Sequence, residues 1–226
     1  PIMIHPEHQR RAYLQAMGID VWVPRDGDEP GLVDEPAVPV EGLGWDDVRE
    51  CVANCTRCKL SQSRTNTVFG VGNPDADWLI IGEAPGAEED RRGEPFVGRA
   101  GQLLDQMLLA IGQSRDSVFI ANILKCRPPN NRDPKPDEAA ACRAYLERQI
   151  ELLRPKIILA VGKIAAQNLL GSADPVGRMR GRPHQFSGIP LVVTYHPAYL
   201  LRSPSQKQKS WSDLCLATRL AAESGS

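Results

Sequence analysis

Four cysteines are spaced as ligands of a metal ion or an iron–sulfur cluster. Cys55 and Cys58 form a C-x-x-C pair, while Cys126 and Cys142 lie farther along the chain. Two close thiolates and two distant ones can form a four-thiolate cage around zinc or around a [4Fe–4S] cluster. The residue types alone do not separate these two, so both stay open at this point.

Cys51 introduces an alternative, because Cys51-x3-Cys55-x2-Cys58 has the spacing found in radical-SAM enzymes. That class needs a much larger barrel and an iron left open for the cofactor. The strands and glycines that follow do not resemble such a barrel. We therefore expect Cys51, like Cys215, to be a cysteine without a ligating role.

Polar and glycine-rich motifs follow short apolar runs. GEAPG (82–86) allows a tight turn and a close approach of backbone N–H groups to a ligand. The next residues, 88–90, add three carboxylates. In EPFVGRAG (94–101) the aromatic Phe96 stands between Pro and Gly. Phe96 is by default a core residue, but these neighbours are also compatible with a stacking platform for a ligand.

Asn122 and His196 each follow a later apolar run. An Asn at a strand end is more often a helix cap than a group that reads a ligand, and an isolated surface His usually has no role. Taken singly, neither residue indicates a function.

These motifs need a scaffold that brings them together. Four apolar runs bounded by turn or cap residues predict buried parallel strands at 78–81, 118–120, 157–161 and 191–195. Helical patterns alternate with them at about 99–112, 136–153, 163–170 and 207–223. This alternation predicts an α/β fold with a parallel sheet covered on both faces. Ligands bind at the carboxyl ends of such strands, where the polar motifs fall, so we expect one site.

Length and charge are compatible with one α/β domain and an appendage. The chain has 226 residues, a mass of 24.8 kDa and 42% hydrophobic residues. Its net charge of −1 is unevenly distributed. Residues 1–50 contain eleven acidic and four basic residues, and the remainder contains 17 acidic and 23 basic residues. The remainder therefore has the basic excess that can neutralise phosphates, although uneven surface composition explains it equally well.

The sequence also bears on location. No apolar run approaches the roughly 20 residues of a membrane-spanning helix. The start, PIMIHPEHQRR, lacks the apolar stretch of a signal peptide. Six cysteines in a chain that is not exported favour metal or cluster ligation over disulfides. We expect a cytoplasmic protein with no membrane partner.

Together, the motifs resemble the iron–sulfur (family 4) uracil-DNA glycosylases over residues 51–222. The matching features occur in the order of the family: Cys55-x2-Cys58, GEAPGAEED (82–90), EPFVGRAGQLLD (94–105), ANILKCRPP (121–129), Cys142 and HPAYLLR (196–202). The resemblance implies a three-layer α/β/α sandwich with a four-stranded parallel sheet. It also implies that Cys55, Cys58, Cys126 and Cys142 hold a structural [4Fe–4S] cluster rather than zinc.

The resemblance further implies a monofunctional enzyme that flips uracil from DNA and hydrolyses its N-glycosidic bond, which starts base excision repair. Asn122 would accept from uracil N3–H and donate to O4, a pattern that cytosine reverses. Phe96 would stack on the flipped base. His196 would donate to O2, where negative charge grows as the base departs.

Other residues take roles by the same resemblance. Glu83 and Ala84 would line the uracil pocket, and Glu89 is the candidate for holding the attacking water. The segment 196–202 would supply a loop that wedges into the DNA, with Arg202 contacting it. Two departures matter. Ala84 stands where other members have Gly, and the motif lacks the Asp that better-known glycosylases use to activate water.

Residues 1–50 are additional to this core. We expect an amphipathic segment at 1–25, an acidic linker rich in Pro and Gly at 26–44, and the glycosylase-like domain at 45–226. Residues 10–25 resemble the N-terminal peptide of the bacterial DNA polymerase III ψ subunit, which docks on the clamp-loader collar. The anchors of such a peptide would be Leu14, Met17 and Trp22.

This second resemblance leaves alternatives open. The N-terminal helix could instead pack on its own domain. The whole chain could also be a non-catalytic, ψ-like adaptor of the clamp loader with a glycosylase-like body. We favour the enzyme, because an adaptor has no need of Phe96, Asn122 and His196 together. The two resemblances imply a bacterial, nucleoid-associated protein of DNA repair and replication.

Overall fold

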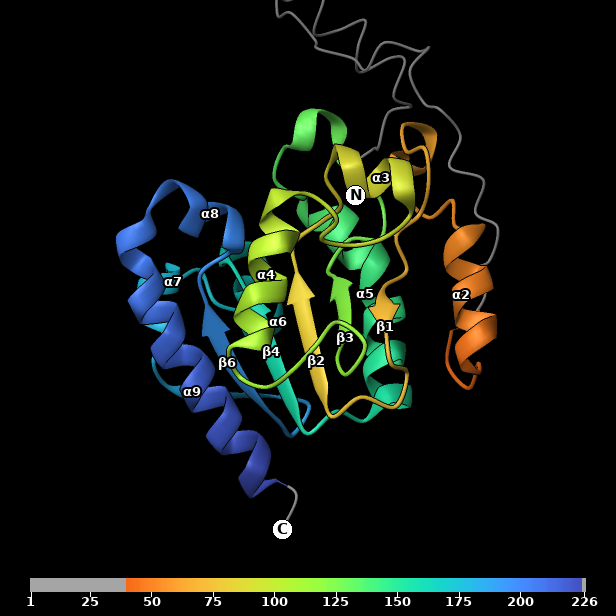
Figure 1. The fold of residues 1–226 in the computed structure, drawn as a ribbon. Coiled ribbons are helices and arrows are strands. Elements are labelled where there is room, and N and C mark those ends of the chain that lie inside the picture. Colours follow the sequence, from red (N-terminus) through yellow and green to blue (C-terminus); the bar gives the residue numbers. More distant parts are fainter. Residues whose placement is uncertain (1–39, 225–226) are drawn as a thin grey trace, which may run out of the picture. The chain divides into compact units, whose positions relative to one another are not determined.

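A computed structural model describes residues 40–224 of the chain, which form a six-stranded sheet between two layers of helices (Figure 1). The strands are β1 (Val71–Gly72), β2 (Trp78–Gly82), β3 (Phe119–Asn122), β4 (Ile157–Val161), β5 (Pro183–Phe186) and β6 (Ile189–Thr194). Their order across the sheet is β1-β3-β2-β4-β6-β5.

The four central strands, β3, β2, β4 and β6, are parallel and confirm the four strands predicted from the sequence. β2, β3 and β4 are buried along their whole length, which explains their continuous apolar runs. The edge strands β1 and β5 are antiparallel to their neighbours and were not predicted. β1 has only two residues, and β5 alternates between exposed and half-buried positions, so neither produces an apolar run.

The helices are α2 (Trp45–Ala53), α3 (Ala87–Arg92), α4 (Arg99–Leu109), α5 (Pro136–Leu153), α6 (Lys163–Leu170), α7 (Val176–Met179), α8 (Pro197–Arg202) and α9 (Lys207–Glu223). Short 3-10 turns occupy Lys59–Gln62, Pro129–Asn131 and Pro204–Gln206. The predicted helices at 136–153, 163–170 and 207–223 are confirmed. The predicted helix at 99–112 ends at Leu109, and Gly112 then adopts a left-handed φ of 74°.

Two hydrophobic cores separate the layers. α4, α8 and α9 cover one face of the sheet, where Leu104, Leu200 and Leu214 are buried. On the opposite face, α2, α5 and α6 cover a core that includes Val48 and Leu146 (Figure 1). This arrangement is the predicted three-layer α/β/α sandwich, and it leaves the carboxyl ends of the central strands free to form a site.

The predicted N-terminal segment and most of the predicted linker lie outside the described residues, including Leu14, Met17 and Trp22. The last linker residues do lie within the described part. Val40 is only 4% exposed and belongs to the core beside α2 and α5. Arg148 of α5 donates from Nε and Nη2 to the carbonyl of Leu43, at 2.8 and 2.6 Å. The end of the predicted linker therefore packs on the domain.

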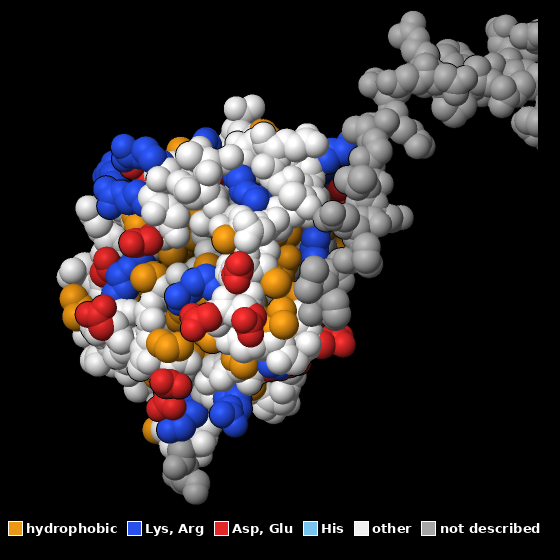
Figure 2. All heavy atoms as spheres, turned by 90° about the vertical axis from the view of Figure 1, so that its right-hand side faces the viewer, with side chains coloured by type: hydrophobic (Ala, Val, Ile, Leu, Met, Phe, Trp, Pro, Cys, Tyr) orange, Lys and Arg blue, Asp and Glu red, His pale blue; other side chains and the backbone are white. Residues whose placement is uncertain are grey.

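The surface of the described residues shows mixed charge on the face that carries α2. Lys and Arg side chains alternate there with Asp and Glu and with small hydrophobic areas (Figure 2). Within residues 40–224, no helix is long and apolar enough to cross a membrane.

Candidate active site

A cavity of about 920 Å³ lies at the carboxyl ends of the four central strands. It is lined by every residue that the sequence assigned to base, water or DNA contact: Glu83, Ala84, Glu89, Phe96, Asn122, His196 and Arg202. The expectation that the strand-end motifs form a single site is therefore confirmed in its geometry. What each side chain does there stays a prediction.

Gly82, the last residue of β2, allows two of these side chains to meet. A Cβ built on Gly82 would lie 2.4 Å from Oδ1 of Asn122 and 2.6 Å from the Phe96 ring. Real Cβ atoms do not tolerate such distances, so any larger residue at position 82 would displace one of the two side chains. The amide of Asn122 and the ring of Phe96 therefore both lie against the end of β2.

Asn122 ends β3 and is paired with Gly82 across the parallel ladder. The side chain is almost fully buried, with 2% of the residue exposed. The backbone carbonyl oxygen of Asn122 accepts a hydrogen bond from Nζ of Lys125 at 3.1 Å, and the same Nζ donates to Oε1 of Gln149 at 2.6 Å. Within residues 40–224 the side-chain amide of Asn122 has no hydrogen-bond partner. Its donors and its acceptor are therefore available to a ligand in the cavity.

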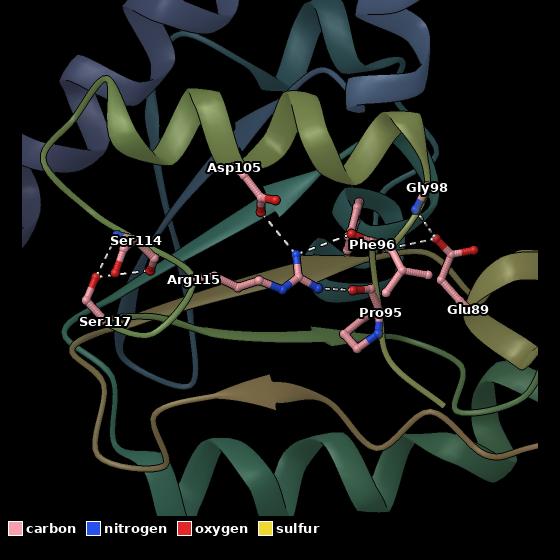
Figure 3. Close-up of polar contacts among 9 residues, drawn as sticks. Glu89, Pro95, Phe96, Gly98, Asp105, Ser114, Arg115 and Ser117 are labelled. Carbon is pink, nitrogen blue, oxygen red and sulfur yellow. Dashed lines mark hydrogen bonds and ion pairs between the residues drawn. The ribbon is translucent and has the colours of Figure 1, made fainter. Parts of the chain in front are cut away.

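Phe96 has a left-handed backbone, with a φ of 55°. This conformation costs a non-glycine residue about 1–2 kcal/mol, so neighbouring contacts must stabilise it. One neighbour is Gly101 in α4, where a Cβ would lie only 1.7 Å from the Phe96 carbonyl oxygen. The backbone on either side of Phe96 is also held by the side chains of Glu89 and Arg115 (Figure 3).

The Glu89 carboxylate accepts three backbone hydrogen bonds. Oε2 accepts from the N–H of Gly86 at 3.1 Å, at the start of α3. Oε1 accepts from the N–H groups of Val97 at 3.0 Å and Gly98 at 3.4 Å. Glu89 thus ties the turn after β2 to the segment that follows Phe96, a contact that the sequence did not predict.

His196 follows β6 and caps the N-terminus of α8. Its Nδ1 accepts a hydrogen bond from the backbone N–H of Ala198 at 3.1 Å. The imidazole stacks on Phe96, with ring centroids 5.6 Å apart and an interplanar angle of 27°. Gly162, at the end of β4, permits this position, because a Cβ there would lie 3.0 Å from Cβ of His196.

The ionisation of His196 follows from its surroundings. Burial lowers the pKa of His196, the positive charge of Arg202 adds to this shift and Glu89 opposes it, and the resulting pKa is about 4. The ring is therefore neutral near pH 7. Because Nδ1 accepts the Ala198 N–H, the single ring proton of this neutral form is on Nε2.

Glu83 and Ala84 line the cavity, as do Lys163 and Asp133. Burial raises the pKa of Glu83, the negative charge of Asp133 adds to this shift and Lys163 opposes it, and the resulting pKa is about 7. Glu83 therefore exchanges between the neutral and the charged form near neutral pH. Arg202, at the end of α8, is exposed at the rim.

The four predicted cysteine ligands belong to, or pack against, the core that α2, α5 and α6 cover. Cys126 and Cys142 are buried, and Cys55 and Cys58 pack against the same core. Arg64 links two of them, since its Nη1 donates to the Cys55 carbonyl at 2.8 Å and to Sγ of Cys126 at 3.2 Å.

The thiols are also electrostatic neighbours. Burial raises the pKa of Cys58 and Cys126, and raises that of Cys142 to about 12. Cys142 interacts with Cys126 and Cys58, and Cys126 interacts with Cys58 and Cys55. As placed, however, no group of three or more Cys, His, Asp or Glu residues among the described ones is arranged to hold a metal ion. Of the remaining cysteines, Cys51 is half-buried and packs against the same core, whereas Cys215 is exposed on α9.

Comparison with known proteins decides the family. The profile described as the uracil DNA glycosylase superfamily matches residues 69–217, which include the cavity from Glu83 to Arg202. The chain belongs to the uracil-DNA glycosylase superfamily.

Relatives narrow the assignment within this superfamily. The type-4 uracil-DNA glycosylase of Archaeoglobus fulgidus is 43% identical over 176 residues, covering 74% of this chain and 88% of that protein. The type-4 enzyme of Thermotoga maritima is 46% identical over 162 residues, covering 71% and 84%. A type-5 uracil-DNA glycosylase of Thermus thermophilus is 34% identical over 150 residues, covering 57% and 68%. Higher identity and coverage place the chain with the type-4 glycosylases.

Several residues that build this glycosylase site were missed from the sequence. Gly162 follows an apolar strand directly, as Gly82 does, so the same signal could have identified it. Asp90 is buried and accepts from the backbone N–H groups of Thr65 and Asn66, at 2.9 and 3.4 Å. Arg115 lies in a loop with no motif around it, and no local pattern could have indicated its contacts.

The tautomer of His196 can be tested by nitrogen NMR. We expect Nε2 to carry the proton at pH 7 and the ring to stay neutral between about pH 5.5 and 8, because its pKa lies near 4. A ¹⁵N-histidine spectrum, with the signals assigned by their loss in His196→Ser, measures both properties. A ring that titrates with a midpoint near the ordinary value of about 6.5, or that carries its proton on Nδ1, would contradict the structure.

Proposed function

We propose that this chain excises uracil from DNA through His196, Asn122 and Phe96, and that it thereby starts base excision repair. One observation carries the proposal. The neutral imidazole of His196, the free amide of Asn122 and the ring of Phe96 share one cavity at the strand ends. Chemistry on a base within a duplex requires the base to be flipped into a pocket of this kind.

Asn122 is the base-reading residue in this proposal. Its amide can accept from uracil N3–H and donate to O4, whereas cytosine offers the opposite pattern. Nζ of Lys125 holds the backbone carbonyl of Asn122, and the side-chain amide packs closely over Gly82. A fixed amide rejects cytosine, because the wrong pairing would leave buried polar groups without partners.

His196 stabilises the leaving group. As the N-glycosidic bond breaks, negative charge develops on uracil O2, and the Nε2–H of a neutral His196 can donate to it. A donor directed at developing charge in a site sheltered from water contributes roughly 3 kcal/mol to transition-state stabilisation. The low pKa of His196 keeps its ring from competing as a charged group for the DNA phosphates.

Glu89 remains our candidate for holding the attacking water. A carboxylate offers about four acceptor sites, and three backbone N–H groups occupy part of that capacity. Oε2 carries one of the three hydrogen bonds and so retains room for a water molecule. In this proposal Glu89 positions the water, and most of the rate enhancement comes from stabilisation of the departing uracil.

We assign DNA contact to α8 and to Arg202 at its C-terminal end. The sequence predicted a loop at 196–202, and this is wrong in form because residues 197–202 are helical. Leu200 is buried, but Tyr199 and Leu201 are 36% and 38% exposed. We propose that these two side chains enter the space left by the flipped base and that Arg202 binds a neighbouring phosphate.

We also propose that Cys55, Cys58, Cys126 and Cys142 hold a [4Fe–4S] cluster. Support comes from the donor set, four thiols that lie in or against one core and interact electrostatically, and from the resemblance to the iron–sulfur glycosylases. When bound, the cluster would tie the segment after α2 to α5 and to the end of β3. Its contribution is structural, and the residues of the cavity carry out the cleavage.

Recruitment by residues 1–25 is a separate proposal that rests on the sequence alone. In it, Leu14, Met17 and Trp22 bind the clamp-loader collar and bring the enzyme to replicating DNA in a bacterial nucleoid.

Asn122→Asp tests the base-reading role. The carboxylate can no longer donate to O4, so uracil excision should fall at least about tenfold. An acceptor now faces the cytosine amino group, so weak excision of cytosine should appear. Both are measured by incubating protein with uracil- or cytosine-containing oligonucleotides and cleaving abasic sites with alkali.

This assay also separates the proposed functions. Unchanged uracil excision by Asn122→Asp would remove Asn122 from the pocket. A wild-type protein without any excision would favour the adaptor alternative over the enzyme.

Metal analysis tests the cluster. Protein purified under low oxygen should contain about four irons per chain and absorb broadly near ~400 nm. Replacing Cys142 with Ala should remove the iron, whereas replacing Cys51 or Cys215 should leave the iron content unchanged. One zinc and no iron in protein prepared in this way would refute the cluster.

A further inference from the structure

We propose that Arg115 is a positioning residue for Phe96, which it holds in the orientation required to stack on the flipped base. The inference rests on the stacking role of Phe96 stated above and adds the residue that enforces it. Arg115 lies in the loop between α4 and β3. Its guanidinium donates to the Asp105 carboxylate and to the backbone carbonyls of Pro95 and Phe96.

The guanidinium of Arg115 binds the backbone on both sides of the strained residue. Nη1 donates to the carbonyl oxygen of Phe96 at 3.2 Å, and Nη2 donates to the carbonyl oxygen of Pro95 (Figure 3). These two carbonyls belong to the two peptide planes that meet at Cα of Phe96. Fixing both planes fixes φ and ψ of Phe96, and so the direction in which its ring projects.

Glu89 completes the arrangement from the opposite side. The N–H of Val97 belongs to the same peptide plane as the Phe96 carbonyl, and it donates to Oε1 of Glu89 at 3.0 Å. This plane is therefore held at both its oxygen and its N–H, between a cationic and an anionic side chain (Figure 3). Such two-sided restraint explains how Phe96 keeps a left-handed conformation with a φ of 55°.

Asp105 of α4 sets the position of Arg115. Its Oδ1 accepts from Nη1 of Arg115 at 3.0 Å, and the two side chains are 38% and 24% exposed. Figure 3 shows the guanidinium between Asp105 and the Pro95–Phe96 segment. Because α4 begins just after this segment, Asp105 and Arg115 connect the helix to the loop that presents Phe96.

Arg115→Met removes the donors while keeping an apolar side chain of similar length. Phe96 should then relax from the left-handed conformation, and single-turnover uracil excision should fall roughly 10- to 100-fold, as expected for a misplaced contact residue. Arg115→Lys can reach one carbonyl and should recover part of the activity. Asp105→Asn keeps Arg115 but weakens its anchor, and should give a smaller loss.

A matched control is Arg148→Met. Arg148 also binds a backbone carbonyl, that of Leu43, and a carboxylate, that of Glu151, but away from the cavity. Its side chain is 19% exposed, close to the value for Arg115. We expect Arg148→Met to lower the melting temperature about as much as Arg115→Met does and to leave excision unchanged.

A double-mutant cycle decides whether Arg115 acts through Phe96. If it does, the loss caused by Arg115→Met, or by Asp105→Asn where Arg115→Met does not fold, disappears in a Phe96→Ala background. Losses that multiply would overturn the positioning role while leaving the stacking role intact. Full excision by Phe96→Ala would overturn the stacking role itself, and with it the inference about Arg115.

Discussion

The backbone N–H of Ala198 donates to Nδ1 of His196 over 3.1 Å, and the proposed chemistry depends on this hydrogen bond. It caps α8, and it also leaves the ring proton on Nε2. Burial is the main cause of the low pKa of His196, about 4, which keeps the ring neutral near pH 7. Gly162 suits this arrangement, since its φ is 100° and a Cβ there would press on the His196 side chain at 3.0 Å. A capping interaction thus prepares a hydrogen-bond donor before any substrate is bound.

Glu83 and Glu89 also line the cavity, but neither takes over the role of the His196 donor. Glu83 has a pKa raised to about 7, so it is only partly charged near neutral pH. The Glu89 carboxylate accepts three backbone hydrogen bonds, which occupy part of its capacity as an acceptor. In this account, the residues of the cavity therefore accelerate cleavage mainly by stabilising the departing uracil. Such stabilisation requires the side chains that contact the base to be held rigidly. The Phe96 segment is accordingly held by Glu89 on one side and by Arg115 on the other.

Much of this arrangement could be predicted from the sequence, because it lies in short, contiguous patterns. The buried parallel strands produce apolar runs, and the motifs that end them converge on one edge of the sheet, as found for Phe96, Asn122 and His196. Contacts between distant, unremarkable positions could not be predicted. Arg115 has no motif around it, and the edge strand β5 is polar and half-exposed. The helical form of residues 197–202 was also missed, although Pro197 directly after His196 is a common start of a helix.

The central claim is that His196 acts as a neutral donor to the departing base, and substitution tests it most directly when capping is kept. His196→Ser retains an N-cap oxygen for the Ala198 N–H but cannot reach the base, whereas His196→Ala loses both functions. Single-turnover uracil excision should be compared with binding to DNA that contains an abasic site. We expect both variants to lose at least about 100-fold in excision and to keep abasic-site binding within about threefold, because the hydrogen bond strengthens only in the transition state. Equal losses of excision and binding, or full excision by His196→Ser, would contradict the claim.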